Sequence, residues 1–312
     1  MNYGLPYMGS KNSIVEWVIG NMPKAEHFYD LFCGGCAITH GALLTNKFKY
    51  IHANDLNPFS MLFLDAIKGK YHNENRWISR EEFEAKKDND AYIAMVWSFG
   101  NNNNKGYLYS PENEKIKHAL WDAIMFNDYT LADKYGIPFK KTTYTNTKNR
   151  RLAIMAHWKK YIVPKIKKGQ IKIGDERAEL QSLERLERLQ SLESLERLQS
   201  LERFTMSTGK YSDVEIKPNS LIYCDIPYRG TAEYTTGSFD HQAFYEWALS
   251  QKELVMVSEY SMPSTFTRVA SVSKRGILSS TANNKVIEGI YVPNSQVELW
   301  EKLTGKKVEK IN

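Results

Sequence analysis

The sequence predicts an α/β fold with a doubly wound, mostly parallel sheet, and three observations support this prediction. Near the N-terminus a strand, a glycine turn, a helix and a second strand follow one another, and the second strand ends in an acid. Strand-like apolar runs return after residue 205. Between these parts, residues 61–175 look mainly helical and basic. We therefore expect one sheet built from both ends of the chain, with a helical insertion between them.

The first predicted strand, residues 27–32, is a short run of mainly apolar side chains. Cys33, Gly34 and Gly35 follow it as a tight turn. Residues 37–44 then have the composition of a helix. Glycines in such a turn let the backbone approach a ligand closely.

The second predicted strand, residues 50–53, ends at the polar pair Asn54-Asp55. Asn57-Pro58 can start a helix that runs to Ile67. An acid at the end of the second strand, after a glycine turn, is typical of a nucleotide-binding sheet.

The second half of the sheet is predicted from apolar runs after residue 205. The predicted strands are residues 221–224, 253–257, 266–272 and 286–292. Because these runs follow the helical segment, we expect them to complete the sheet that the N-terminal strands begin.

The composition sets limits on the class of protein. The chain has 312 residues, of which 42% are hydrophobic and 25% charged, as in a globular protein. Three cysteines are too few for a disulfide framework, which excludes a small disulfide-stapled protein. No apolar run approaches the roughly 20 residues of a membrane helix, and the N-terminus lacks the apolar core of a signal peptide. We expect a cytoplasmic protein.

The positive charge is concentrated in the middle of the chain. The net charge is +6, and residues 61–175 hold 21 basic and 13 acidic side chains. The segment from Lys140 to Lys172 contains eleven cations and no acid. A charge confined to one segment favours a polyanionic partner for that segment, with chemistry housed elsewhere. The alternative is an ordinary solvated basic surface.

Residues 176–204 hold an internal repeat in which leucine recurs at every third position. Leu, Glu, Arg and Gln are strong helix formers, but a step of three on a helix of about 3.6 residues per turn winds the leucine stripe around the axis. A coiled coil, whose seam needs a spacing of about 3.5, is therefore disfavoured. We expect a helical connector, with a disordered linker or a β-solenoid-like stack as alternatives.

The strongest chemical signal is Asp225-Ile226-Pro227-Tyr228, directly after a predicted strand. Doubly wound folds bind ligands at the carboxyl ends of their strands. Pro227 holds Ile226 extended, so that the Asp225 carboxylate and the Ile226 carbonyl can accept both hydrogens of one amino group. These bonds make the nitrogen of a base amine more nucleophilic, and Tyr228 can stack on that base. A surface turn is the alternative for four such residues in isolation.

Four motifs in a fixed order give this tetrapeptide its context: Pro6-Tyr7-Met8-Gly9-Ser10-Lys11, Asp30-Leu31-Phe32-Cys33-Gly34-Gly35, Asn54-Asp55 and Asp225-Ile226-Pro227-Tyr228. With them, the sequence resembles the Dam-type adenine-N6 DNA methyltransferases, in particular their phage and prophage relatives. The resemblance spans nearly the whole chain. It implies a Rossmann-like sheet that transfers a methyl group from S-adenosylmethionine to the N6 amine of adenine at a specific DNA site, with S-adenosylhomocysteine as product.

The resemblance also implies roles for individual residues. Asp30, Phe32 and Gly34 form the loop around the methionine part of the cofactor, and Asp55 holds the ribose hydroxyls. The cofactor-binding residues that it implies are Tyr7, Gly9, Lys11, Asp30, Phe32, Cys33, Gly34, Gly35, Asn54, Asp55 and Asp225. The implied catalytic residues are Asp225, Ile226, Pro227 and Tyr228, acting on a flipped-out adenine without a metal.

In the same resemblance, the helical insertion is the target-recognition domain and its partner is double-stranded DNA. Basic side chains grip phosphates, and a few polar side chains read base edges. The DNA-binding residues that we expect are Asn101, Asn102, Lys140, Lys141, Arg150, Arg151, Lys159 and Lys160. We expect no membrane contact and no obligate protein partner, in the cytoplasm of a bacterial host or a phage-infected cell.

The implied domains follow from these assignments. The expected catalytic domain comprises residues 1–60 and 205–312. The expected target-recognition domain is residues 61–175, and the leucine-repeat connector is residues 176–204.

Two residues depart from the family pattern. Ile226 replaces the first proline of the usual Asp-Pro-Pro-Tyr, although its main-chain carbonyl is retained. Cys36 stands where the cofactor loop commonly has another glycine. If that position requires a positive φ, Cys36 strains the loop and weakens cofactor binding.

Other interpretations stay open. Cys33 and Cys36 have the spacing of a redox pair that opens a helix, and with His40 and His52 they could hold zinc. The tetrapeptide chemistry also fits a methyltransferase for cytosine N4 or for adenine in RNA. Finally, the chain could be a DNA-binding relative that has lost catalysis.

Overall fold

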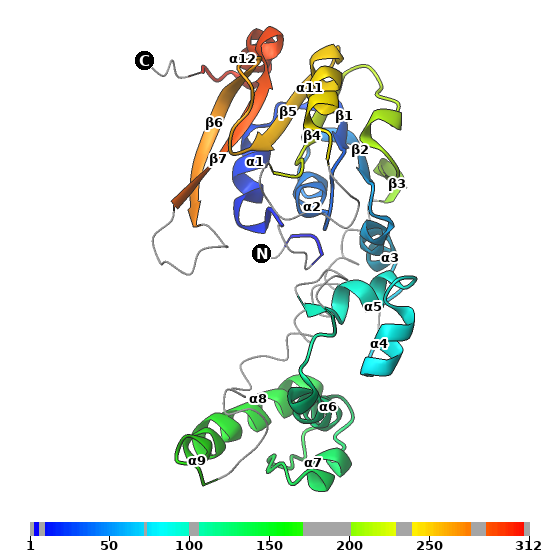
Figure 1. Ribbon diagram of the computed structural model, residues 1–312, viewed down its shortest axis with the longest axis vertical. Helices are drawn as coiled ribbons and strands as arrows, with labels where there is room; N and C mark the ends of the chain where they lie inside the picture. Colours follow the sequence, from blue (N-terminus) through cyan, green and yellow to red (C-terminus); the bar gives the residue numbers. More distant parts are fainter. Residues whose placement is uncertain are drawn as a thin grey trace. The chain divides into compact units, whose positions relative to one another are not determined.

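The computed structural model describes residues 3–5, 10–71, 74–99, 106–170, 201–228, 239–275 and 285–308. The chain divides into two compact units. The sheet unit comprises residues 1–70 and 191–312, and the helical unit comprises residues 71–190 (Figure 1).

The sheet unit is built on seven strands in the order β3-β2-β1-β4-β5-β7-β6 (Figure 1). Strands β1 to β5 pair in parallel, whereas β7 is antiparallel to both β5 and β6. The strands are β1 (Ala25–Asp30), β2 (Phe48–Asp55), β3 (Phe204–Thr208), β4 (Ser220–Cys224), β5 (Leu254–Glu259), β6 (Phe266–Arg275) and β7 (Lys285–Pro293). This mostly parallel sheet confirms the predicted Rossmann-like α/β fold.

The two ends of the chain meet in the middle of the sheet. β1 pairs in parallel with β4, with His27 opposite Ser220 and Asp30 opposite Tyr223. β2 lies on the other side of β1, and β5 on the other side of β4. The strand order therefore reverses between β1 and β4, and such a switch point is where doubly wound sheets bind ligands.

Helices cover both faces of the sheet. Asp30 on one face of β1 accepts hydrogen bonds from Thr39 of α2, whereas Tyr29 on the other face packs in one buried cluster with Phe244 and Ala248 of α11. The helices of this unit are α1 (Val15–Asn21), α2 (Ala37–Leu43), α3 (Leu62–Ile67), α11 (His241–Ser250) and α12 (Val297–Thr304). Short 3₁₀ turns lie at Asn12–Ile14, Pro58–Met61, Leu201–Arg203, Tyr211–Asp213 and Asn294–Gln296.

β3 is a strand that the sequence did not predict. It lies at the edge of the sheet, and only Phe204 of its five residues is buried. Its polar side chains give no alternation of apolar residues. The strand is held through backbone pairing with β2 and by the Ser207 hydroxyl, which donates to Asn54 Oδ1 at 2.9 Å.

The described part of the helical unit consists of short helices (Figure 1). They are α4 (Arg80–Lys86), α5 (Ala91–Val96), α6 (Pro111–Met125), α7 (Thr130–Lys134), α8 (Thr147–His157) and α9 (Val163–Lys167). A π-helical turn at Trp158–Ile162 joins α8 to α9. No described helix in either unit is long and apolar enough to cross a membrane.

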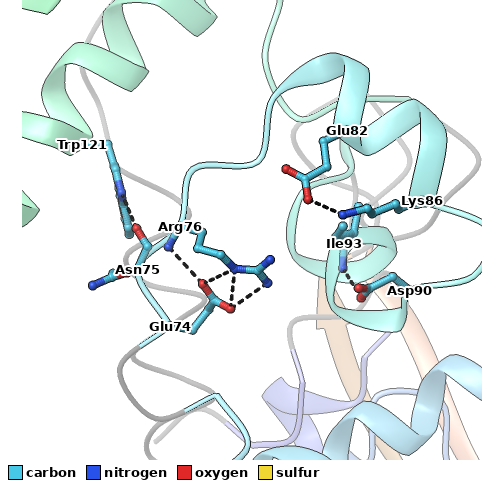
Figure 2. A network of polar contacts seen from close by, with 8 residues as sticks. All are labelled: Glu74, Asn75, Arg76, Glu82, Lys86, Asp90, Ile93 and Trp121. Atoms are coloured by element: carbon cyan, nitrogen blue, oxygen red, sulfur yellow. Dashed lines mark hydrogen bonds and ion pairs between the residues drawn. The ribbon is translucent and has the colours of Figure 1, made fainter.

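Capping and buried tryptophans stabilise the helical unit. Asp90 caps α5 by accepting from the Ile93 N–H, and the Trp121 indole donates to the Asn75 carbonyl at 3.0 Å (Figure 2). Trp97 and Trp121 are fully buried. Lys86 and Glu82 form an ion pair one turn apart on the surface of α4 (Figure 2). These contacts give the unit its own core.

Most of the leucine repeat lies outside the described residues, which resume at residue 201. The predicted connector therefore stays a prediction.

Candidate active site

Carboxylates gather at the carboxyl edge of the parallel strands. Asp30 ends β1, Asp55 ends β2, Asp225 follows β4 directly, and Glu259 ends β5. Since parallel strands end at the same edge, these side chains belong to one region around the β1/β4 switch point. An edge rich in acids is electrostatically complementary to a ligand that carries positive charge.

Asp30 is a buried carboxylate with an unused oxygen. Its Oδ2 accepts from the Thr39 N–H at 3.1 Å and from the Thr39 hydroxyl at 2.7 Å. Its Oδ1 is buried and has no hydrogen-bond partner among the described residues. Burial raises the pKa of Asp30 to about 7. An orphaned buried oxygen of this kind fits a ligand that brings a donor or a cation.

Asp55 ties the end of β2 to the glycine turn. Its Oδ2 accepts from the Gly34 N–H at 2.7 Å, and its Oδ1 accepts from the Asn57 N–H at 2.8 Å. Gly34 has a φ of 47°, which favours glycine. Burial raises the pKa of Asp55, and the bonds from Asn57 and Gly34 partly offset that effect. Each carboxylate oxygen keeps a lone pair that can accept from a hydroxyl.

The glycine turn is held by close backbone contacts. The Leu5 N–H donates to the Gly35 carbonyl at 2.6 Å, and a Cβ on Gly4 would lie 2.2 Å from that same oxygen. Cys36 closes the turn with a φ of 59° and is fully buried. The positive φ that makes Cys36 a strained replacement for glycine is therefore present.

Lys11 links the N-terminal segment to the tetrapeptide. Its Nζ lies 2.5 Å from Asp225 Oδ1 and 3.3 Å from Glu288 Oε1, and it also donates to the Tyr228 hydroxyl. The Lys11 side chain is only 4% exposed. Burial alone would lower the pKa of Lys11, but the charges of Asp225 and Glu288 outweigh burial and raise it. Lys11 is therefore a buried ammonium.

The ring of Tyr228 has aromatic and ionic neighbours. Lys11 Nζ lies 4.5 Å from its centroid, and the Tyr260 ring lies 4.4 Å away, tilted by 50°. The Tyr228 hydroxyl donates to Glu288 Oε1. Burial, and then the negative charges of Asp225 and Glu288, raise the pKa of Tyr228 well above its ordinary value. The hydroxyl is neutral and the ring can offer an apolar face to a base.

Ile226 and Pro227 have separate structural roles. The Ile226 side chain is 2% exposed and belongs to the buried cluster around Ile222, Val257 and Phe244. The Pro227 carbonyl lies 2.9 Å from Nε2 of His241, the first residue of α11. Isoleucine therefore adds apolar packing at a position where the side chain faces the core.

The family model of the D12 class N6 adenine-specific DNA methyltransferases matches residues 7–292. The chain belongs to this family. Its activity is methylation of the N6 amine of adenine in DNA, with S-adenosylmethionine as methyl donor. Among curated proteins, no relative matches the chain.

In this D12 methyltransferase the structure brings together many of the predicted residues. Lys11, Asp225 and Tyr228 are in direct contact, and Asp55 contacts Gly34. The Cys33 N–H donates to the Asn54 carbonyl at 3.0 Å. Tyr7 and Gly9, which were predicted to bind the cofactor, lie outside the described residues.

Two predicted cofactor residues have structural roles that the sequence did not indicate. The Asn54 amide donates to the Gly209 carbonyl at 2.9 Å and accepts from Ser207, so its side chain fastens β3 to β2. The Phe32 ring packs edge-on against Phe244 and lies 5.2 Å from the Tyr211 ring. A polar residue at a strand end and an aromatic in a loop carry no sequence signal that separates binding from packing.

The alternative interpretations of Cys33 and Cys36 do not fit the geometry. Both thiols are buried, and burial raises the pKa of each, which is the opposite of a reactive redox thiol. His40 Nδ1 accepts from the Gly4 N–H, and His52 bonds to His27 and Thr205. No group of three or more His, Cys, Asp or Glu side chains in the described parts of the chain could hold a metal ion.

The basic residues of the helical unit divide into two kinds. Arg150 is 6% exposed, and its guanidinium donates to the carbonyls of Ile124, Met125, Tyr144 and Thr145. Its guanidinium donors are therefore used by backbone carbonyls at the end of α6 and before α8, and the prediction that Arg150 binds DNA stays a prediction. Lys140, Lys159 and Lys160 are exposed, Arg151 is half-buried, and Lys141 pairs with Asp133 at 2.8 Å. Asn101 and Asn102 lie outside the described residues.

Glu288 is a site residue that sequence reasoning missed. It lies in β7 and is fully buried beside Lys11 and Tyr228. The run Glu288, Ile290 and Val292 points to one buried face, so an acid in phase with apolar residues was a usable signal. The proximity of Glu288 to Asp225 could not be predicted from the sequence, because this proximity depends on the direction of β7.

Proposed function

We propose that the chain methylates adenine in double-stranded DNA by direct transfer, with the residues around Asp225 as the reacting centre. The observation that carries this proposal is the placement of Asp225 directly after β4 at the switch point, in contact with Lys11. Asp225 and the Ile226 carbonyl accept the two hydrogens of the target amine, and Tyr228 stacks on the base. No residue of the chain forms a covalent intermediate in this reaction.

The residues at the carboxyl edge fit S-adenosylmethionine. When bound, this cofactor supplies an electrophilic methyl group on a sulfonium centre. Asp30, through its unused Oδ1, would hold the cofactor's ammonium, and the half-buried Asp55 would hold the ribose hydroxyls. The glycine turn gives the backbone room to approach the ligand. Asp225 takes part in orienting the amine and then accepts the proton that the methylated nitrogen loses.

The helical unit supplies the DNA contacts in this proposal. Its segment from α8 through α9 exposes Lys148, Lys159, Lys160, Lys165, Lys167 and Lys168. Leu152 on α8 is 60% exposed and Tyr161 on the π-helical turn is 49% exposed. The lysines bind phosphates, and exposed apolar and polar side chains are available to contact base edges in the major groove. We propose the cytoplasm of a bacterial or phage-infected cell as the compartment where this DNA is met.

Transfer of labelled methyl from S-adenosylmethionine to unmethylated plasmid DNA tests the proposal. We expect label on adenine N6, and modification-sensitive long-read sequencing should place it at one short recurring sequence. The matched control is Asp225→Ala, which should remove transfer and leave DNA affinity within about twofold of native. Label on cytosine, label on RNA alone, or full activity of Asp225→Ala would contradict it.

A further inference from the structure

Glu288 reaches the site from β7, which among the described strands is the one antiparallel to its neighbours β5 and β6. β7 pairs antiparallel with β5, and Gly289 lies opposite Glu259 at the carboxyl end of β5. The first residues of β7 therefore lie at the edge where the parallel strands end. The Glu288 side chain is fully buried at that edge.

The contacts of Glu288 form a chain of polar groups that ends at Asp225. Glu288 Oε1 accepts from the Tyr228 hydroxyl and lies 3.3 Å from Lys11 Nζ. Lys11 Nζ donates to the same hydroxyl and lies 2.5 Å from Asp225 Oδ1. One buried ammonium is thus shared by two carboxylates, and one hydroxyl is bonded on both sides.

Burial of this carboxylate is not explained by stability. Removing an ionised carboxylate from water is costly, and a buried ion pair is often no more stabilising than apolar side chains of similar volume. Glu288 projects from the same strand face as Ile290 and Val292, where an apolar side chain would extend the core. A charge retained at such a position points to a role in the site.

The charges of Lys11, Asp225 and Glu288 explain what Glu288 contributes to the site. If Lys11 faced Asp225 alone, the pair would be neutral and the ammonium would compete with the target amine for the carboxylate oxygens. With Glu288 present, the three groups carry one net negative charge. Asp225 therefore keeps an attractive potential toward an amine that becomes positive as it is methylated.

We propose that Glu288 is a positioning residue for methyl transfer, which holds the Tyr228 hydroxyl and shares the Lys11 ammonium so that Asp225 can accept the target amine. The inference rests on the proposed function. It predicts that Glu288 affects the rate of transfer from the bound complex, while binding of DNA depends on other residues.

The test compares single-turnover transfer of labelled methyl to plasmid DNA by native protein, Glu288→Gln and Glu253→Gln. Glutamine keeps the size and an acceptor oxygen but removes the charge. Glu253 is the matched control, because its carboxylate bonds the Ser220 N–H at 3.0 Å at the opposite end of β4. We expect Glu288→Gln to slow transfer by about tenfold or more, with the half-saturating DNA concentration within about twofold and an unchanged melting temperature, whereas Glu253→Gln keeps the native rate.

Tyr228→Phe gives a second route to the same answer if Glu288→Gln does not fold. It removes the hydroxyl that Glu288 holds and leaves the buried charges in place. We expect slower transfer from Tyr228→Phe measured alone. Where Glu288→Gln folds, the double variant should lose less than the product of the two single losses, because the two residues act through one contact.

Three outcomes would overturn the inference. They are a native rate for Glu288→Gln, a rate that falls only in proportion to the loss of folded protein, and a native rate for Tyr228→Phe. If native protein transfers no methyl group, the proposed function itself fails and the inference with it. Native transfer together with an unaffected Glu288→Gln removes the inference alone.

Discussion

At the scale of single residues, the site is built from polar groups whose partners are incomplete without a ligand. Asp30 is the clearest case, because one oxygen is fully used by Thr39 and the other is buried without a partner among the described residues. Lys11 shows the opposite situation, since its ammonium contacts Asp225, Tyr228 and Glu288 at once. We expect the cofactor and the base to bind at groups of the first kind, such as Asp30. Groups of the second kind, such as Lys11, are expected to orient the residues that they contact.

The raised pKa of Asp30 makes two measurable quantities depend on pH. Its pKa in the folded protein is about 7, above the ordinary value of 3.8, so the folded state holds a proton that the unfolded state releases between these values. The free energy of unfolding should therefore fall as pH rises from about 4 to about 7, and this slope should disappear in Asp30→Asn. Denaturant titrations of both proteins across that range measure it.

Cofactor affinity should show the complementary trend. Because the ionised form of Asp30 attracts an ammonium, affinity for S-adenosylmethionine should rise as pH passes through about 7. In Asp30→Asn we expect affinity at pH 8 to be about tenfold weaker and nearly independent of pH. Calorimetric titration at several pH values checks this, and an unchanged affinity would remove Asp30 from the cofactor site.

Gly4 allows a second prediction at this scale. A methyl group there would overlap the Gly35 carbonyl, and the φ of 66° also disfavours other residues. We expect Gly4→Ala to lower the free energy of unfolding by about 2 kcal/mol or more and to weaken cofactor binding through the turn. Gly20→Ala is the control, since Gly20 lies in α1 with open space around it and should be neutral or stabilising. Equal stabilities would contradict the prediction.

At the scale of elements, the strands rich in apolar residues were predicted from the sequence. The strand β3, which has few apolar residues, was not predicted. β1, β2 and β4 to β7 were predicted near their observed bounds, because buried strands are continuous or alternating apolar runs. β3 was missed because it holds one buried residue, Phe204, and is fixed by contacts from β2. The direction of β7, which brings Glu288 to the site, is set by tertiary packing and leaves no mark in its own residues.

Arg150 shows the same limit, because its burial and its hydrogen bonds could not be predicted from the sequence. A basic residue in a basic segment is predicted to bind phosphate. The guanidinium of Arg150, however, donates hydrogen bonds to carbonyls at the end of α6. Lys159 and Lys160 lie further along the same segment and are exposed. Charge patterning thus predicts the segment, while burial decides which of its cations are exposed.

The segment from α8 through α9 can be tested by its response to salt. The double variant Lys159→Gln, Lys160→Gln should bind DNA more weakly, and the slope of log affinity against log salt should become shallower by about 0.9 for each phosphate that the protein no longer neutralises. The exposed Lys302 of α12 serves as control, and Lys302→Gln should leave the slope unchanged. Fluorescence anisotropy with duplex DNA between low and moderate salt measures both. An unaltered slope in the double variant would place the DNA-binding surface elsewhere.

At the scale of the whole molecule, the site residues come from two distant stretches of the chain that one sheet holds together. Lys11, Asp30 and Asp55 come from the first stretch, and Asp225 and Glu288 come from the last. The helical unit lies between them in sequence and has a core of its own. Catalysis and recognition are therefore expected to respond separately to substitutions.

The leucine repeat gives a prediction at this scale. The site contacts that the structure describes involve residues before position 71 and after position 200, so a shorter repeat removes none of these described contacts. We expect deletion of residues 183–199 to leave methyl transfer measurable, within about tenfold of the native rate. Methyl transfer and circular dichroism on the deletion variant check this. Complete loss of activity in a folded variant would give the repeat a working role beyond spacing.

The pairing of β1 with β4 has a consequence for synthesis of the protein. β1 needs β4 as its neighbour, but Ser220 leaves the ribosome long after His27, with the whole helical unit made in between. At roughly 5–20 residues per second, the strand waits about 10–40 s for its partner. During that time β2 can pair with one edge of β1, while the backbone edge that β4 will occupy is open to pairing with other chains. The active site is thus among the last features to form, and nascent chains that end before β4 should be the species that chaperones and proteases meet first.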